Sequence, residues 1–132
     1  MREILFRGKT AGGKWTYGSL VHRTMFYGDP CDDYIILSDG EFHCDYYYDS
    51  EVIPETVGQF TGVTDKKGAR IFEGDIVKYF DALGFSKGFG VVSWDTIFSG
   101  WRAEKNTLYG SKYISKYEVV GNIHDNPELL EV

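Results

Sequence analysis

The residues with the clearest chemical potential form two short clusters in the first third of the chain. Thiols, an imidazole and carboxylates come together at Cys31, Asp32, Asp33, His43, Cys44 and Asp45. Two thiolates, one imidazole and one carboxylate are a ligand set that zinc accepts. The clusters lack C-x-x-C spacing, and neighbouring strand residues such as His43 and Cys44 point to opposite faces. A metal site is therefore an alternative, and we expect no metal or cofactor.

A hydrolytic site would need an acid, a base or a nucleophile within mutual reach. The best-placed pair is His124 beside Asp125, and Glu55, Glu73 and Asp75 add carboxylates in one stretch. The sequence has no strand-turn-helix nucleophile motif and no glycine-rich phosphate loop that opens a helix. We therefore predict no catalytic residues, and an unrecognised hydrolase or metal protein is kept as an alternative.

Aromatic side chains are the second unusual resource, with 10 Tyr, 9 Phe and 3 Trp among 132 residues. Rings interleaved with basic residues can stack nucleic-acid bases, and the same residue types are enriched in protein interfaces. The candidates are Tyr46, Tyr47, Tyr48, Phe85, Phe89, Trp101, Arg102, Lys105, Tyr109, Lys112 and Tyr113. A small β fold also uses such rings as its core, which is the simpler explanation for any one of them.

The net charge of -6 weakens the nucleic-acid interpretation, because backbone affinity depends on Lys and Arg that neutralise phosphates. Basic residues such as Lys66, Lys67 and Arg70 are better explained as a solvated turn. We therefore favour a protein interface, formed by Tyr46, Tyr47, Tyr48, Trp101, Arg102 and Tyr109. The partner would be another protein or a second copy of the chain, and binding of single-stranded nucleic acid is the alternative.

Composition predicts the elements that must position these residues. Hydrophobic residues make up 42% and charged residues 26%, which is ordinary for a globular protein, and 16 Gly favour turns. The two cysteines are too few for a disulfide framework, so we expect free thiols. No apolar run reaches the roughly 18 residues of a membrane helix, and no signal peptide is visible, so we expect the whole chain to be the mature, cytoplasmic protein.

Alternating apolar residues predict two hairpins in the first fifty residues. The first joins Arg2–Arg7 to Trp15–Val21 across a glycine-rich loop. A turn is expected at Gly28–Pro30, and the second hairpin joins Tyr34–Leu37 to Phe42–Tyr48 through an Asp-Gly turn.

The segment Val52–Val77 has the densest turn signals. Pro54 predicts a bend, and Gln59–Val63 and Ala69–Phe72 flank a four-residue turn. A second reversal follows at Glu73-Gly74-Asp75, where Asp75 is expected to accept hydrogen bonds from turn amides. We predict structural turn roles for Pro54, Gly62, Gly68, Gly74, Asp75, Gly121 and Pro127.

Four further strands are predicted at Ile76–Phe80, Phe89–Trp94, Ile97–Ala103 and Tyr113–Ile123. Asn126 and Pro127 then mark the N-cap and first position of a short helical turn. The fold class is therefore mainly β (β-rich α+β), in one compact unit covering residues 1–132. Residues 54–132 are expected to form a small, partly open β-barrel, and residues 1–53 an additional β layer.

Several motifs resemble the YopX family of phage and prophage proteins. They are Arg2–Lys9 (REILFRGK), Trp15–Gly18 (WTYG), Pro54–Gly62 (PETVGQFTG), Asp65–Gly68 (DKKG), Glu73–Val77 (EGDIV) and Glu118–Leu130 (EVVGNIHDNPELL). The resemblance implies a phage-encoded intracellular protein with a compact β-rich fold. We expect it to be an accessory protein of the host cytoplasm whose partner is a host or phage protein. It assigns no catalytic residue and no substrate. The EGDIV motif also resembles a turn of SH3-like barrels, a likeness of fold that implies no function.

Overall fold

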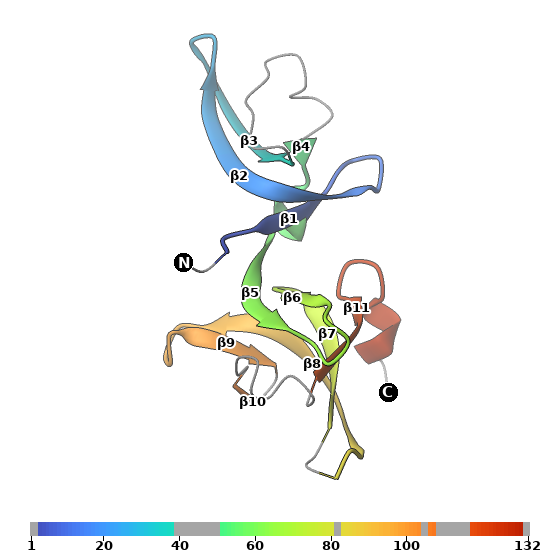
Figure 1. The fold of residues 1–132 in the computed structure, drawn as a ribbon. Helices are drawn as coiled ribbons and strands as arrows, with labels where there is room; N and C mark the ends of the chain where they lie inside the picture. Colours follow the sequence, from blue (N-terminus) through green and yellow to red (C-terminus); the bar gives the residue numbers. More distant parts are fainter. Residues whose placement is uncertain (1–2, 39–50, 81–82, 104–105, 108–116, 131–132) are drawn as a thin grey trace. The chain divides into compact units, whose positions relative to one another are not determined.

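The computed structural model describes residues 3–38, 51–80, 83–103, 106–107 and 117–130, and the structural statements concern these residues (Figure 1). The chain divides into two compact units, which follow one another in sequence at Gln59 and Phe60. Both are built from antiparallel strands, which confirms the prediction of a mainly β protein. Within the described residues, no helix has the length and apolar character needed to cross a membrane.

Unit 1 is an antiparallel sheet with the strand order β4-β3-β2-β1, followed by the first residues of β5. The strands are β1 (Phe6–Lys9), β2 (Trp15–Phe26), β3 (Asp29–Leu37), β4 (Glu51–Val52) and β5 (Gly58–Thr64). The 3-10 turn η2 (Pro54–Thr56) lies between β4 and β5. The predicted first hairpin is confirmed, because Phe6 pairs with Gly18 and Lys9 with Trp15.

The turn predicted at Gly28–Pro30 lies instead at Tyr27 and Gly28, so that Asp29 and Pro30 belong to β3. Strands β2 and β3 are joined by Tyr27 and Gly28 alone, whose φ angles are 50° and 85°. Two positive φ angles are the signature of a type I′ hairpin turn, whose twist matches that of the strands. Pro30 lies within β3, next to an irregularity in the pairing, where a proline is tolerated. The strand predicted at Phe42–Tyr48 lies outside the described residues.

The interior of unit 1 is formed by aliphatic residues of neighbouring strands. Ile35 and Ile36 are completely buried, and Val52 is buried beside them in the paired strand β4. Arg7 is also buried, and its guanidinium lies 4.9 Å from the centre of the Trp15 ring. The buried hydrophobic residues described in this unit are thus aliphatic, and a buried arginine lies beside a tryptophan ring.

Unit 2 contains the end of β5 and a five-stranded sheet with the order β10-β9-β8-β7-β11. Its elements are β6 (Arg70–Phe72), β7 (Asp75–Phe80), β8 (Ser86–Asp95), β9 (Gly100–Ala103), β10 (Asn106–Thr107), β11 (Tyr117–Asn122) and the 3-10 turn η4 (Pro127–Leu130). Strand β5 pairs with β6, which confirms the predicted hairpin there. Within the described part of the chain, the strands do not close into a complete barrel.

The core of unit 2 consists of Val63, Ile71, Val77, Val92, Ala103 and Tyr117. Tyr79, Trp101 and Val119 are partly buried and pack against this cluster. Paired residues of β7 and β11, such as Val77 and Val119, therefore face the core together. Residues one position away on each strand face the opposite side of the sheet.

Two expectations in unit 2 need correction. Ile97 and Phe98 were expected in a strand, but β8 ends at Asp95 and β9 begins at Gly100, which leaves both residues in the turn. Asn126 does precede η4, and its carbonyl accepts the Leu129 amide, but its side-chain oxygen accepts a hydrogen bond from the amide of Asn122. That side chain therefore fixes the preceding loop.

Candidate interaction surface

The hairpin of β8 and β9 has a turn whose backbone is held by one carboxylate. Asp95 Oδ1 accepts hydrogen bonds from the Ile97 amide at 2.8 Å and the Phe98 amide at 3.2 Å. Asp95 Oδ2 accepts a hydrogen bond from Arg102 Nη1 at 2.9 Å. Asp95 thus joins both strands to the turn, as Asx side chains commonly do.

The charge on Asp95 is stabilised by the same contacts. The hydrogen bond from Arg102 lowers the pKa of Asp95 below its ordinary value, and the Phe98 and Ile97 amides lower it further, against a smaller opposing effect of burial. The carboxylate therefore remains ionised, and the turn remains fastened, throughout the neutral range.

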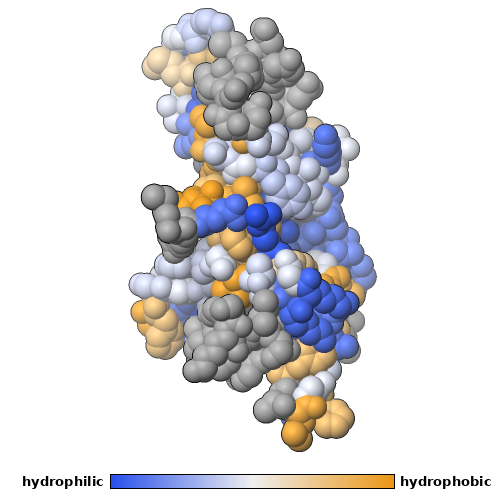
Figure 2. Space-filling model, in the orientation of Figure 1, coloured by the Kyte–Doolittle hydropathy of each residue, from blue (hydrophilic) through white to orange (hydrophobic). Residues whose placement is uncertain are grey.

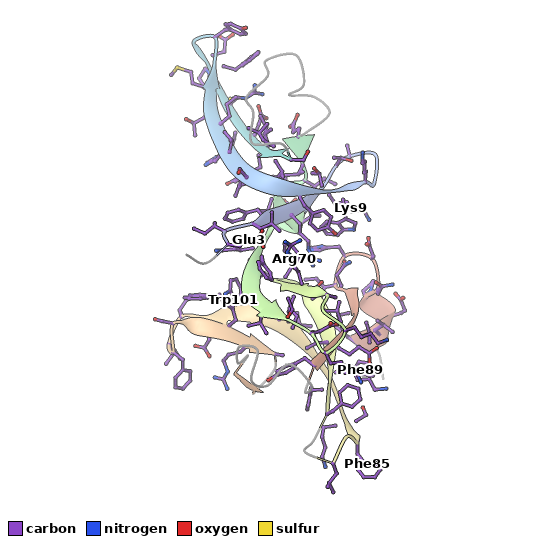
Figure 3. The ribbon with its side chains drawn as sticks, viewed as in Figure 1. Glu3, Lys9, Arg70, Phe85, Phe89 and Trp101 are labelled. Carbon is purple, nitrogen blue, oxygen red and sulfur yellow. The ribbon has the colours of Figure 1, made fainter. Side chains whose placement is uncertain are left out.

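The tip of this hairpin exposes a group of apolar side chains. Ile97 is 86% exposed, Phe98 is 71% exposed and Trp94 is 46% exposed. Trp94 meets Trp101 edge to face, with ring centres 5.1 Å apart, and the Arg102 guanidinium lies 5.1 Å from the centre of the Phe98 ring. These five residues are called the hairpin patch, which covers both faces of the tip because the consecutive residues Trp101 and Arg102 point to opposite sides of β9. Figure 2 shows hydrophobic surface at the hairpin tip, on the left of the view, and Figure 3 shows Trp101 on β9.

The hairpin patch contains two residues of the predicted interface, Trp101 and Arg102. The others, Tyr46, Tyr47, Tyr48 and Tyr109, lie outside the described residues, as do Lys105, Lys112 and Tyr113.

Trp94, Ile97 and Phe98 are not among the predicted contact residues, because the apolar runs that contain them predict strands. The predicted strand bounds leave Asp95 and Thr96 as a turn, and the structure extends this turn to Ser99, because Asp95 caps the Ile97 and Phe98 amides.

The described half of the possible metal site is divided between two faces of the β2–β3 hairpin. On one face, Asp33 Oδ2 accepts hydrogen bonds from Arg23 Nε at 3.2 Å and Nη2 at 2.5 Å, and the Cys31 thiol donates to the Arg23 carbonyl oxygen at 3.4 Å. The Arg23 hydrogen bond lowers the pKa of Asp33. Asp32, one residue away, projects from the other face.

On that other face, His22 Nε2 lies 2.6 Å from Asp32 Oδ1, and the His22 ring stacks on Tyr34 with centres 4.3 Å apart. Among the described residues, no three potential ligands come close enough to hold a metal ion. His43, Cys44 and Asp45 lie outside the described residues. The described residues here form hydrogen-bonded pairs that support the hairpin.

The His124–Asp125 pair lies in the loop that follows β11. Both backbone amides donate to Asn122 Oδ1, at 3.0 Å and 2.9 Å, and Asn122 Nδ2 donates to Asp125 Oδ2 at 3.2 Å. These contacts describe a tight loop held by one asparagine. These hydrogen bonds give the His124–Asp125 pair a structural setting.

The predicted turn residues lie at turns, bulges and helix starts. Pro54 and Pro127 begin η2 and η4, Gly62 lies in an irregular stretch of β5, and Gly68 and Gly74 lie in the turns on either side of β6. Gly121 approaches Asn126 so closely that an added Cβ would lie 2.5 Å from Asn126 Oδ1.

Asp75 is buried, and its Oδ2 accepts a hydrogen bond from the Phe72 amide at 2.7 Å. This bond spans the reversal between β6 and β7.

A hollow of about 510 Å³ lies in unit 1, beside the loop between β1 and β2. Its lining residues are Thr10, Ala11, Gly12, Glu51, Val52, Ile53 and Pro54. Glu51 is the one ionisable side chain in this described lining. General acid–base chemistry uses several groups in mutual reach, and the described lining provides one such group.

Comparisons with known proteins identify a family and a similar solved structure. A family model described as YopX protein matches residues 6–131. No curated protein matches the chain. The chain is similar to the crystal structure of protein EF1440 from Enterococcus faecalis, with 23% identity, a TM-score of 0.61, and coverage of 98% of this chain and 99% of that one. At this identity, the likeness concerns the fold alone.

Proposed function

The chain belongs to the YopX family, and from this membership together with the hairpin patch we propose that it is a phage or prophage accessory protein that acts by binding another protein. The exposure of Ile97 and Phe98 at the β8–β9 tip is the observation that carries this proposal. The partner is a host or phage protein in the host cytoplasm. The proposed role is not enzymatic.

The composition of the hairpin patch supports binding to protein. Tryptophan and arginine are enriched among the residues that contribute most to protein interfaces, and the patch combines Trp94, Trp101 and Arg102 with two exposed apolar side chains. Exposed large apolar groups gathered in one place commonly mark contact sites. The net charge of -6 presents no obstacle to such a contact.

The rigidity of the tip also supports binding. Asp95 fastens the amides of Ile97 and Phe98, so their backbone is already ordered before a partner arrives. Ordering a loop on binding costs free energy, and a pre-ordered loop avoids most of that cost. The side chains of Ile97 and Phe98 are thus presented for insertion into an apolar pocket.

The test is affinity capture from phage-infected host lysate with three forms of the protein. We expect the natural chain to retain a specific partner and Ile97→Ser/Phe98→Ser to lose it. The matched control is Met25→Ser/Tyr27→Ser, which removes apolar side chains of 63% and 83% exposure from the β2–β3 tip. Retention of the partner by Ile97→Ser/Phe98→Ser would contradict the proposal.

Light scattering after size exclusion distinguishes a foreign partner from a second copy. Self-association through the hairpin patch would give a concentration-dependent mass that Ile97→Ser/Phe98→Ser lowers to that of the monomer. A monomeric natural chain with no specific partner in the lysate would remove the support for an interaction role.

A further inference from the structure

A second surface of unit 2 carries lysines and phenylalanines on one face of the sheet. Lys78 on β7 pairs with Phe89 on β8 and with Glu118 on β11, so these three side chains form a row across three strands. Their neighbours Val77 and Val119 face the core. The row therefore lies on the side of the sheet away from that core. Figure 3 shows Phe89 near the lower part of the β7–β8 hairpin.

Two lysines lie against the ring of Phe80, which is on the same face as Lys78. The ammonium of Lys66 lies 3.9 Å from the ring centre, and that of Lys78 lies 5.6 Å from it. Lys66 belongs to the turn between β5 and β6, so residues distant in sequence converge on this ring. Lys66, Lys67, Lys78, Phe80 and Phe89 are called the lysine–phenylalanine face.

The charge of this face is opposite to that of the whole chain. Glu118 Oε1 lies 2.7 Å from Lys67 Nζ, and Glu118 Oε2 lies 3.6 Å from Lys66 Nζ. Three lysines thus lie near two described carboxylates, Glu118 and Asp65, which leaves one excess positive charge on this part of a chain whose net charge is -6. The Lys67 side chain is 68% exposed, so an anion in solvent can approach it beside its ion pair with Glu118.

We propose that the lysine–phenylalanine face binds single-stranded nucleic acid, with the lysines on the phosphates and the rings of Phe80 and Phe89 stacked on bases. Grooves that combine basic side chains with aromatic platforms bind single strands in this way. The lysines could bind either phosphates or the carboxylates of an acidic peptide. The phenylalanine rings favour nucleic acid, because they can stack on bases and an acidic peptide has no need of them. The face comes from β7, β8, β11 and the β5–β6 turn, and it contains no residue of the hairpin patch.

The experiment is fluorescence anisotropy with labelled oligothymidylate of about twelve nucleotides, within the range of roughly 4 to 16 that such sites occupy. The whole chain is titrated at several salt concentrations, starting near 50 mM, where phosphate contacts are strongest. Variants are Lys66→Gln, Lys78→Gln, Phe80→Leu and Phe89→Leu. The control is Lys14→Gln, which makes the same charge change at an exposed position in unit 1.

We expect binding that weakens with salt. Lys66→Gln and Lys78→Gln should each lower the slope of log affinity against log salt by roughly 0.7, the value for one lost single-strand phosphate contact. Phe89→Leu, at the more exposed ring, should weaken binding by about tenfold, the scale of one lost base stack. Lys14→Gln should bind as the natural chain does.

Three results would overturn the proposal. The first is no binding at low salt. The second is equal binding by Lys66→Gln, Lys78→Gln, Phe89→Leu and the Lys14→Gln control, which would move the ligand to another surface. The third is equal affinity for an abasic strand of the same length. Such a strand keeps the phosphates and lacks the bases, so equal affinity would show that base stacking on the rings contributes nothing. Circular dichroism of each variant separates lost binding from lost folding, and Phe89→Leu tests stacking if Phe80→Leu fails to fold.

Discussion

The Asp65 side chain links a turn of unit 2 to a neighbouring strand. Its side chain is 1% exposed, and Oδ1 accepts the amides of Lys67 and Ala69 at 2.8 Å and 2.9 Å. Oδ2 accepts the amide of Val119 at 3.0 Å, which joins the β5–β6 turn to β11. A carboxylate that holds three amides fixes a turn and a strand edge together.

We predict that Asp65→Ala lowers the free energy of unfolding by about 2 kcal/mol, because three partly buried amides lose their acceptor. Asp65→Asn should lose less, because one oxygen acceptor remains. Urea denaturation of the three proteins measures the differences. Equal midpoints for Asp65→Ala and the natural chain would show that water replaces the carboxylate without cost.

A similar prediction concerns Asp75, at the turn between β6 and β7. Asp75→Ala should lower the melting temperature, because the buried Phe72 amide loses the acceptor that lies 2.7 Å away. The expected loss is about 1 to 3 kcal/mol, the usual cost of a buried unsatisfied donor. Differential scanning calorimetry provides the measurement, and an unchanged melting curve would contradict the structural role of this carboxylate.

Asp95 gives a prediction about pH. Its pKa in the folded chain is lowered, chiefly by Arg102, below the ordinary value of 3.8. Such a group stabilises the fold above its unfolded pKa, and this contribution disappears as the pH falls through the folded pKa. Stability contributed by Asp95 should therefore be complete at neutral pH and should decline below about pH 4.

The measurement compares Asp95→Asn with the natural chain by urea unfolding at neutral and acid pH. The difference between the two proteins should be largest at neutral pH and should shrink in acid. Asp29→Asn, at the β2–β3 turn, controls for general loss of negative charge. A difference that stays constant with pH would show that the ion pair with Arg102 contributes no pH-dependent stability.

Among the elements, the β2–β3 hairpin has a type I′ turn whose first residue is Tyr27, a residue type that is unusual at this position. Tyr27 occupies a left-handed conformation that tyrosine adopts with strain, and its side chain is 83% exposed. Asparagine accepts this conformation far more readily, and Asn-Gly is the preferred type I′ pair. The strain is thus confined to one exposed residue, and replacing Tyr27 by asparagine tests it directly.

We predict that Tyr27→Asn stabilises unit 1 by about 0.5 to 1 kcal/mol, the usual size of a relieved backbone conformation. The edge contact with the Phe26 ring, whose centre lies 4.4 Å away, is lost and offsets part of the gain. Tyr27→Ala is the control, since it loses the ring without relieving the backbone. A Tyr27→Asn protein no more stable than Tyr27→Ala would contradict this account.

Elements with clear local signals were predictable from the sequence. The hairpins around the glycine-rich loop and around Asp65–Gly68 follow from alternation and turn chemistry, and both are present. The tip of β8–β9 was not predictable from alternation, because Ile97 and Phe98 continue an apolar run that an Asx turn interrupts. The position of the hairpin patch therefore depends on whether Asp95 caps the turn or the strands continue to pair. Residue types alone do not decide between these two outcomes.

The lysine–phenylalanine face was also beyond sequence reasoning. Lys66 and Phe80 are distant in the sequence, and only the pairing of strands brings the β5–β6 turn to the ring at the end of β7. The basic residues had been explained as a solvated turn. The strand register places Lys78 opposite Phe89, so that basic and aromatic side chains from separate strands lie on one surface.

At the scale of the whole molecule, strand β5 changes its partner along its length. Its first residues pair with β1 in unit 1, where Gln59 lies opposite Phe6, and from Phe60 onward it pairs with β6 in unit 2. Each unit has its own buried residues, such as Ile36 in the first and Ile76 in the second. This arrangement predicts two cooperative units that can open separately.

Gly18 provides the test, because it lies in unit 1 where no side chain fits. A Cβ added there would lie 2.1 Å from the carbonyl oxygen of Leu37, a contact that only movement of the backbone relieves. Gly18→Ala should cost unit 1 about 1 to 3 kcal/mol, the range for overpacked sites. Hydrogen exchange should then accelerate at the amides of Ile35 and Ile36 and remain unchanged at Val77, in the centre of unit 2. Equal acceleration in both units would show that β5 couples them into a single cooperative structure.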